Sequence, residues 1–336
     1  MPGQVPGNVV AVLGTRYQDL AIEEAVLRPL GVRLVTGAGQ DAEAVVAAAA
    51  GADVILAGSG PRFDAAVLTR LSCRGIVRYG VGTDSIDLGA AARAGIWVAR
   101  VADYGTEAVA VHALTLALAA IRRLPEADAV LRRGGWGFAA LRPLHLPSAM
   151  TAGVVGFGRI GRRTAGLFAG LGFRTLAYDP YVPVAPGDSA GAPVVPASLP
   201  ELLGACDVVS LHAPGGSGDA PLLDAAALDA MRPGAALVNT ARGSLIDMAA
   251  LVAGLRRNRP RIAALDVFPA EPVEIADFPP DVADRLILTP HMAWYTEESE
   301  ADLRTKAAQE AARLLRGEPP RDVVVDPGTP QEASPP

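Results

Sequence analysis

Three polar residues in the second half of the chain have side chains suited to the reduction of a 2-keto acid by hydride transfer. Arg242 has a planar guanidinium that can bind a carboxylate through two hydrogen bonds and polarise the neighbouring carbonyl. His291 can deliver a proton to the developing alkoxide, and a carboxylate beside it, such as Glu271, favours the charged imidazolium. Taken singly, each residue is explained as well by a surface, turn or structural role, so the hypothesis rests on all three together.

A glycine-rich segment at 154–161 predicts a dinucleotide site. Gly156 allows a tight turn, Gly158 lets the backbone approach a pyrophosphate, and Gly161 lets the following helix pack closely on the strand. Asp179 ends the next apolar run, where it would accept hydrogen bonds from ribose hydroxyls and repel a 2′-phosphate. The order of strand, turn, helix, strand and acid therefore favours NAD over NADP, the alternative being a glycine-rich turn without a ligand.

The segments that carry the polar residues all follow apolar runs typical of buried strands. Residues 239–243 follow one such run, residues 266–272 a second and residues 290–294 a third. Because the carboxyl ends of parallel strands meet at one edge of a sheet, we expect these segments to lie together where a nicotinamide would bind.

Alternating strand and helix patterns along the whole chain predict the α/β class, with two doubly wound parallel-sheet (Rossmann-like) domains and an active-site cleft between them. The expected strands are 9–13, 32–35, 54–57 and 75–78, then 152–155, 174–178, 207–211, 235–239, 262–265 and 286–289. The flavodoxin-like substrate domain is assigned to residues 1–103 plus 297–336, and the NAD-binding domain to residues 104–296. A long apolar helix is expected at 108–124, followed by an irregular arm at 132–150.

The composition argues against several other classes of protein. The net charge of −6 over 336 residues gives no reason to expect nucleic acid as a partner. Cys73 and Cys206 lie in or beside apolar runs and are interpreted as buried thiols, and no ligand cluster suggests a metal. No secretory signal or membrane-spanning run is expected, so the prediction is a cytoplasmic protein.

Six motifs between about residue 9 and residue 325 resemble those of one enzyme family. They are Arg78–Asp84, the glycine loop with Asp179, Leu211–Pro214, Asn239–Gly243, Asp266–Pro272 and Pro290–His291. The family is that of the D-isomer-specific 2-hydroxyacid dehydrogenases. The resemblance implies an NAD-dependent reduction of a 2-keto acid to the D-2-hydroxy acid, with Arg242 as substrate anchor and Glu271 and His291 as the acid/base relay.

The resemblance also implies roles for further residues. Val81 and Gly82 would offer backbone N–H groups to the substrate carboxylate, Asp266 would contact the nicotinamide amide, and His212 and Pro214 would line the cofactor cleft. The full set of cofactor-binding residues is Gly156, Gly158, Arg159, Ile160, Gly161, Asp179, His212, Pro214, Thr240, Asp266 and Ala293, and the substrate-binding set is Arg78, Tyr79, Gly80, Val81, Gly82 and Trp294. A homodimer is expected, formed through the 108–124 helix and the arm after it.

The segment 291–295 resembles the branch of the family that contains the C-terminal-binding-protein corepressors. In that branch Trp294 would be a wall of the substrate pocket, although a packing role at a domain seam is equally open. The branch supplies the alternative function, an NAD(H)-sensing binding protein with little turnover. Formate-type oxidation is disfavoured because Glu271 stands where those enzymes have an amide.

Two features leave the substrate and the cofactor affinity open. Segment 215–219 reads Gly-Gly-Ser-Gly-Asp, where family members usually have a pair of threonines close to the cofactor. Arg62 and Arg78 follow predicted strands of the first domain, and either one could bind a second anionic group on the substrate.

Overall fold

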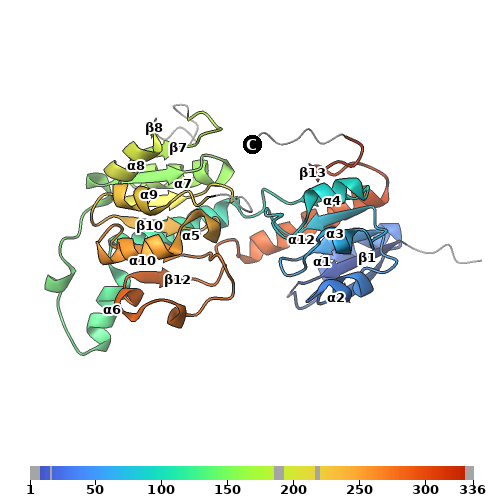
Figure 1. Ribbon diagram of the computed structural model, residues 1–336, viewed down its shortest axis with the longest axis horizontal. Coiled ribbons are helices and arrows are strands. Elements are labelled where there is room, and N and C mark those ends of the chain that lie inside the picture. Colours follow the sequence, from blue (N-terminus) through green and yellow to red (C-terminus); the bar gives the residue numbers. More distant parts are fainter. Residues whose placement is uncertain (1–7, 16, 185–192, 216–219, 330–336) are drawn as a thin grey trace, which may run out of the picture. The chain divides into compact units, whose positions relative to one another are not determined.

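The computed structural model of the chain divides it into two units, which are described separately (Figure 1). Unit 1 comprises Met1–Gly105 and Thr296–Pro336, and unit 2 comprises Thr106–Tyr295. The structure describes residues 8–15, 17–184, 193–215 and 220–329. Unit 1 is therefore built from two stretches of sequence, and unit 2 from one.

The described part of unit 1 contains a six-stranded sheet in the order β13-β5-β4-β3-β1-β2. The strands are β1 (Val9–Leu13), β2 (Arg33–Gly37), β3 (Val54–Ala57), β4 (Gly75–Arg78), β5 (Trp97–Arg100) and β13 (Val323–Val325). The first five are parallel, and β13 pairs antiparallel with β5. Strand β3 is buried along its whole length, as expected where helices cover both faces of a parallel sheet.

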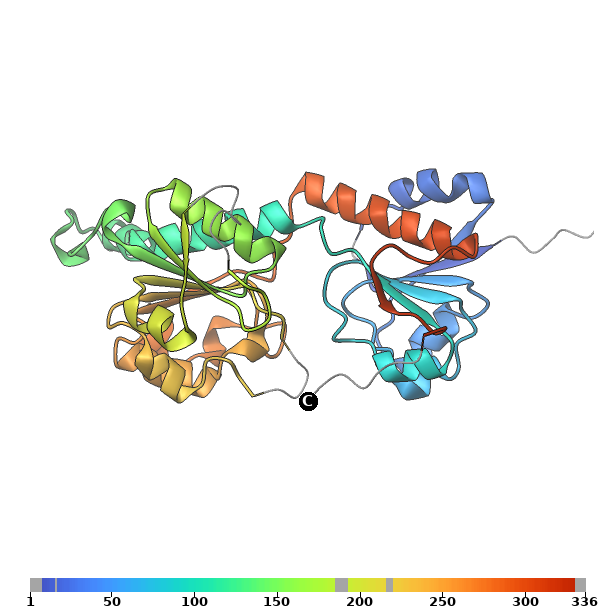
Figure 2. The ribbon, with the colours of Figure 1, turned by 90° about the horizontal axis from the view of Figure 1, so that it is seen from above.

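Helices cover both faces of the unit 1 sheet (Figure 2). On one face, α1 (Ala21–Leu27) packs against α12 (Glu297–Leu315), the helix that returns from the far end of the chain. The other face holds a core under α2 (Ala42–Ala48), α3 (Ala65–Leu68) and α4 (Leu88–Arg93). These three helices begin where the sequence supplies an aspartate N-cap: Asp41, Asp64 and Asp87 each accept a hydrogen bond from a backbone N–H of the first turn.

The described part of unit 2 contains a seven-stranded, all-parallel sheet in the order β12-β11-β10-β9-β6-β7-β8. Its strands are β6 (Thr151–Val155), β7 (Arg174–Tyr178), β8 (Val194–Pro196), β9 (Val208–Leu211), β10 (Ala236–Asn239), β11 (Ile262–Leu265) and β12 (Leu286–Leu288). The chain order reverses between β6 and β9. In open parallel sheets, ligands bind beyond the carboxyl ends of the strands at such a reversal.

The helices of unit 2 form two layers about its sheet (Figure 2). One core lies under α5 (Thr106–Ile121) and α7 (Arg159–Gly170), and the other lies under α8 (Leu199–Ala205), α9 (Ala225–Ala230), α10 (Met248–Arg256) and α11 (Pro280–Ala283). Helix α6 (Leu124–Arg132) follows α5 and leads into the arm at 133–150, which contains only short 3₁₀ turns at Ala139–Leu141 and Pro147–Ala149.

These sheets confirm the predicted α/β class with two parallel-sheet domains. Both cysteines are buried and unpaired by disulfide, and burial raises the pKa of each thiol to about 12. Within the described residues, no single helix is long and apolar enough to span a membrane. Helices α5 and α6 form a bent pair that together reaches the length and apolar composition of a membrane span, on those two criteria alone.

Candidate functional site

The glycine loop lies between β6 and α7, at the reversal of strand order in unit 2. Gly156 has a φ of +92°, and a Cβ there would lie 2.5 Å from the nitrogen of Ala213. A Cβ at Gly161 would lie 1.9 Å from the carbonyl oxygen of Gly156, so only glycine allows α7 to start so close to the strand. At Gly158, by contrast, a Cβ would meet nothing within 4 Å. The loop is thus tight where it touches protein and open where a pyrophosphate would approach the start of α7.

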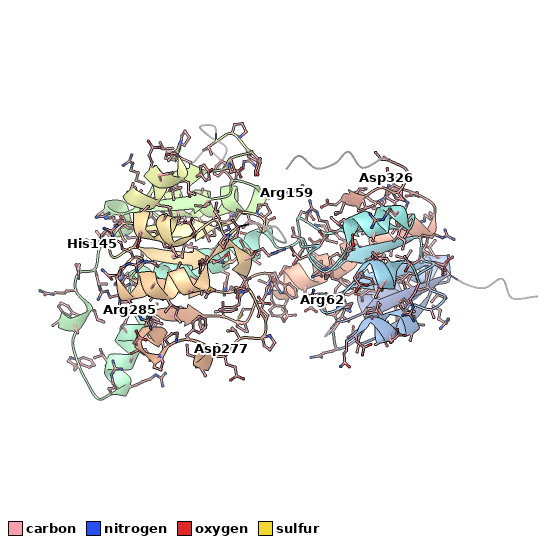
Figure 3. The ribbon with its side chains drawn as sticks, in the orientation of Figure 1. Arg62, His145, Arg159, Asp277, Arg285 and Asp326 are labelled. Carbon is pink, nitrogen blue, oxygen red and sulfur yellow. The ribbon has the colours of Figure 1, made fainter. Side chains whose placement is uncertain are left out.

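Arg159, the first residue of α7, is exposed (Figure 3). Ile160, the next residue, is half-buried. Asp179 follows β7 and holds the glycine loop directly, because its Oδ2 accepts a hydrogen bond of 2.7 Å from the N–H of Phe157. Its Oδ1 accepts from the N–H groups of Tyr181 and Val182 at 2.8 and 2.9 Å. An ionised carboxylate has about four acceptor positions, so capacity remains for a ribose hydroxyl.

Two polar side chains lie at the ends of β9 and β10. The Nε2 of His212 lies 2.9 Å from the hydroxyl of Ser210, and burial lowers the pKa of His212 to about 3, so the imidazole is neutral. Thr240 is 8% exposed, and its Oγ1 has no hydrogen-bond partner among the described residues. A buried hydroxyl without a partner is costly in a finished protein, so it indicates a missing ligand atom. Together with the open position at Gly158, this hydroxyl fits a bound dinucleotide.

Arg242 is positioned by the turn that follows β10. The side chain of Asn239 ties this turn together: its Nδ2 donates to the carbonyl of Arg242 at 2.8 Å and its Oδ1 accepts from the N–H of Ala241 at 3.0 Å. Gly243 packs against the backbone of Phe268, where a Cβ would come within 2.0 Å of the carbonyl carbon. This close approach brings the Arg242 turn alongside the segment that leads to Glu271.

The side chains of His291 and Glu271 are joined by a hydrogen bond. The Nδ1 of His291 lies 2.8 Å from Oε2 of Glu271, while Oε1 of Glu271 accepts from the N–H of Phe268 at 3.0 Å. Their side chains are 46% and 36% exposed. Because an ionised carboxylate can only accept, the hydrogen of this bond resides on Nδ1, and Nε2 is left as the atom that can exchange a proton with a ligand.

Asp266 is fully buried, and its carboxylate is bound to the loop that carries His291. Its Oδ1 accepts from the N–H of Met292 at 2.9 Å, and its Oδ2 accepts from the N–H of Ala293 at 2.8 Å. The observed partners of this carboxylate are therefore protein groups, and the predicted contact with a nicotinamide amide stays a prediction. Trp294, next along the loop, is half-buried, with its ring edge-to-face to that of Tyr295 at 5.7 Å.

In unit 1, the predicted substrate-binding residues at the end of β4 and in the loop after it differ in their hydrogen-bond partners and their burial. The Nη1 of Arg78 donates to the carbonyls of Ala57 and Tyr79. Tyr79 is 5% exposed, and its hydroxyl donates to Glu23 at 2.9 Å. Gly80 has a φ of +130°, which suits glycine, and Val81 and Gly82 after it are half-buried. The Arg78 and Tyr79 side chains are therefore hydrogen-bonded within unit 1.

The remaining predicted residues in the described part of the chain are Arg62 and Pro214, and both are exposed to solvent. Arg62 is exposed, beyond the end of β3 (Figure 3). Pro214 is exposed after β9, and of the unusual segment 215–219 only Gly215 lies within the described residues. No group of three or more His, Cys, Asp or Glu side chains in the described ranges could hold a metal ion.

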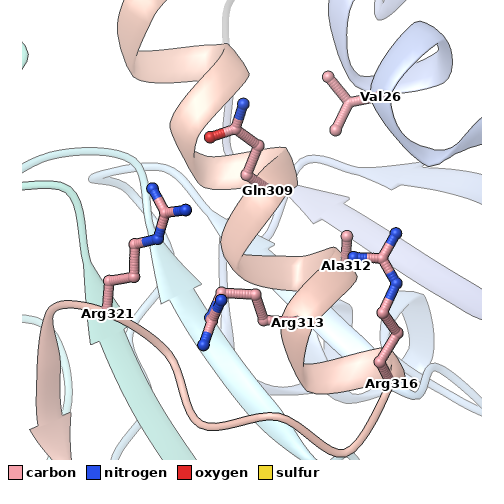
Figure 4. A pocket seen from close by; sticks show the side chains of 6 residues that line it. All are labelled: Val26, Gln309, Ala312, Arg313, Arg316 and Arg321. Atoms are coloured by element: carbon pink, nitrogen blue, oxygen red, sulfur yellow. The ribbon is translucent and has the colours of Figure 1, made fainter.

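A cavity of about 310 Å³ lies elsewhere, at the carboxyl end of α12 in unit 1 (Figure 4). It is lined by Val26, Gln309, Ala312, Arg313, Arg316 and Arg321. Arg313 already donates to the carbonyl of Pro319 and pairs with Glu318. Basic side chains at the negative end of a helix dipole are expected without a ligand, so this cavity is not a candidate active site.

The chain is similar in sequence to a known family of proteins. Residues 114–293 match the model of the D-isomer-specific 2-hydroxyacid dehydrogenase NAD-binding domain. D-3-phosphoglycerate dehydrogenase of Mycobacterium leprae is 38% identical over 296 residues, which are 88% of this chain and 55% of that protein. The chain thus spans about half the length of the curated relatives it matches.

Two solved structures have the same fold over nearly the whole chain. The TT0316 protein from Thermus thermophilus has a TM-score of 0.82 and 32% identity, with 94% of this chain and 100% of that one covered. D-lactate dehydrogenase from Aquifex aeolicus, complexed with NAD and lactic acid, has a TM-score of 0.80 and 25% identity, with coverage of 92% and 96%.

Proposed function

This chain belongs to the D-isomer-specific 2-hydroxyacid dehydrogenase family, and we propose that it reduces a 2-keto acid to the D-2-hydroxy acid with NADH. The observation that carries the proposal is the pair of His291 and Glu271, joined at 2.8 Å, beside the turn that holds Arg242. Such a pair leaves one imidazole nitrogen free to donate a proton, which is what the reduction of a carbonyl requires.

Each residue then has one task. Bound NADH supplies the hydride. Arg242 binds the substrate carboxylate and polarises the adjacent carbonyl, which draws charge onto the carbonyl oxygen. The Nε2 of His291 gives its proton to that oxygen, while Glu271 stabilises the imidazolium before the transfer and holds the ring in place through Nδ1. The Oγ1 of Thr240 and the open backbone at Gly158 hold the cofactor.

The substrate carries a second anionic group, and Arg62 rather than Arg78 holds it. The Nη1 of Arg78 is bound to carbonyls of its own unit, whereas Arg62 is exposed. Several relatives of this chain bear the name D-3-phosphoglycerate dehydrogenase, which describes a substrate with a phosphate beyond the hydroxy acid. Arg62→Ala should therefore raise KM for a phosphorylated keto acid more than for pyruvate, and an equal rise for both would exclude this role.

The protein acts as a homodimer through α6 and the arm. Six large apolar side chains between residues 124 and 146 are exposed to solvent: Leu124, Leu131, Trp136, Phe138, Leu144 and Leu146. Trp136 is 92% exposed. A patch of this kind on a folded protein marks an interaction surface, and a second copy supplies a matching one.

The test is the loss of NADH absorbance with a panel of 2-keto acids: glyoxylate, pyruvate, branched and aromatic keto acids, oxaloacetate and 3-phosphohydroxypyruvate. We expect turnover on at least one member, and a loss of at least about a hundredfold in kcat in His291→Ala and Glu271→Gln. Glu24→Gln, which changes an exposed glutamate of α1 that belongs to no proposed site, is the matched control for Glu271→Gln and should retain activity. NADH binding without turnover on any member would instead favour the sensing function of the corepressor-like alternative.

A further inference from the structure

The side chain of His112 reaches from α5 to the strand end that precedes His291. It is 18% exposed, and its Nε2 lies 3.1 Å from Oγ1 of Thr289 and 3.7 Å from Oδ1 of Asp266. Nothing in the proposed reaction uses His112. A histidine in an otherwise strongly apolar helix must find a polar partner, and here that partner is the segment between β12 and His291.

The directions of these hydrogen bonds follow from the groups involved. Oγ1 of Thr289 lies 2.5 Å from Oδ1 of Asp266, and an ionised carboxylate can only accept. The hydroxyl hydrogen of Thr289 is therefore directed to Asp266, and the same oxygen accepts from Nε2–H of His112. The result is a chain of donors running from His112 through Thr289 to the buried carboxylate.

Asp266 in turn holds three successive N–H groups of the catalytic loop. Its backbone carbonyl accepts from the N–H of His291 at 2.9 Å, and its two carboxylate oxygens accept from Met292 and Ala293. Two successive N–H groups around one anion form a stable local arrangement. The Asp266 carboxylate therefore holds the backbone at residues 292–293, and the Asp266 main-chain carbonyl holds His291.

The backbone of His291 needs this support. Its φ is +52°, in the left-handed region that a side chain with a Cβ rarely adopts. Such a conformation costs about 1–3 kcal/mol and persists only where surrounding contacts enforce it. It also turns the imidazole so that Nδ1 meets Glu271 at 2.8 Å.

We propose that His112 is a positioning residue for the reaction: through Thr289 it fixes the Asp266 carboxylate, and thereby the loop that presents His291 to the substrate. The inference rests on the proposed function for its kinetic readout. It assigns His112 no contact with substrate or cofactor. Its effect is on the rate of the proton-coupled step and not on the affinity for either ligand.

Four variants test this inference: His112→Ala, His112→Gln, Thr289→Val and the double variant His112→Ala/Thr289→Val. We expect His112→Ala and Thr289→Val to lower kcat by about 10- to 100-fold, as small displacements of catalytic groups do, with KM and the Kd for NADH changed by less than about threefold. His112→Gln places an amide N–H near the position of Nε2 and should restore most of the rate. Because both residues act through one chain, the double variant should be no slower than the slower single variant.

Thr305→Val is the matched control, since its exposed hydroxyl bonds only to its own helix at Ala301. Backbone amide exchange over residues 289–295 supplies a readout that needs no turnover, and it should accelerate in His112→Ala but not in Thr305→Val. Unchanged exchange, additive rate losses, or no rescue by glutamine would each overturn the inference. If the wild type itself turns over no keto acid, the proposed function fails, and the exchange measurement still decides the role of His112.

Discussion

A sharp test of how unit 1 is held together is the replacement Arg304→Met. Glu23 has no exposed surface, and both of its carboxylate oxygens are bound by Arg304, at 3.0 Å from Nε and 2.9 Å from Nη2. The hydroxyl of Tyr79 supplies the one other bond to this carboxylate within the described chain. Arg304 also donates to the carbonyl of Asp19 at 2.7 Å and lies 4.5 Å above the ring of Tyr17.

The expected magnitude follows from what each change leaves behind. Arg304→Met keeps an apolar stem but leaves the Glu23 carboxylate buried with one neutral donor, and breaking a buried ion pair in this way costs about 3–5 kcal/mol. Glu23→Leu leaves a cation that still reaches Asp19 and Glu300, so its cost is smaller, about 1.5–3 kcal/mol. With both changes together no charge remains unpaired, and the double variant should approach the wild type in stability.

Urea unfolding gives the free energies, and Trp97 on β5 reports on unit 1. The other two tryptophans, Trp136 and Trp294, lie in unit 2 and are replaced by phenylalanine in every variant, the reference protein included. The reasoning is refuted if Arg304→Met costs less than about 1 kcal/mol, or if the double variant loses as much as the sum of the single ones.

Three further predictions concern unit 2. The Gly158→Ala variant should fold normally, because the added methyl group meets no protein atom within 4 Å, but it should weaken NADH binding by about tenfold or 1.4 kcal/mol. The Gly161→Ala variant should instead destabilise unit 2 itself, and equal melting temperatures for the two variants would contradict this prediction. The pKa of His212 is near 6.5 in the unfolded chain but only about 3 in the folded protein. The free energy of unfolding present above pH 6.5 should therefore fall by about 2.7 kcal/mol by pH 4.5, and His212→Gln should remove this part of the fall when urea unfolding is measured at both pH values. Replacing Trp136 and Phe138 by serine should convert a dimer into a monomer in sedimentation experiments, and a monomeric wild type would exclude the proposed interface.

The fold class was predictable because its signals are local. Short, mostly apolar runs correctly indicated ten strands: β1 to β4, β6, β7 and β9 to β12. Three strands were missed, for identifiable reasons. Strand β8 has only three residues, and β13 lies among prolines, where the sequence suggested only an extended tail; its strand character comes from antiparallel pairing with β5. Strand β5 is as long as β3 and β4, and its apolar residues at 97–99 were overlooked. Pairing with a distant partner cannot be seen in a short segment by itself.

For the candidate site, the sequence indicates which residues lie at the ends of strands, but it does not indicate which groups these residues form hydrogen bonds with. Arg242, Glu271 and His291 were singled out by residue type and position, and their catalytic roles stay predictions. That Tyr79 turns inward to Glu23, or that Asp266 binds Met292 and Ala293, depends on packing between distant segments. No role was predicted for His112 in the apolar helix at 108–124, although an isolated polar residue in such a helix is itself a signal that a partner exists.

The division of unit 1 into two stretches of sequence has a consequence for biosynthesis. During translation, residues 8–105 leave the ribosome long before α12 and β13, so the sheet edge at β5 lacks its antiparallel neighbour and Glu23 lacks the arginine that lies 281 residues further on. Unit 2, which is continuous, can complete its core in that interval, since domains generally fold as units in the order of synthesis. Residues 8–105 therefore reach their native state only after unit 2 has been synthesised, and until the segment that begins at Thr296 arrives they present an open strand edge of the kind on which chaperones and aggregation both act.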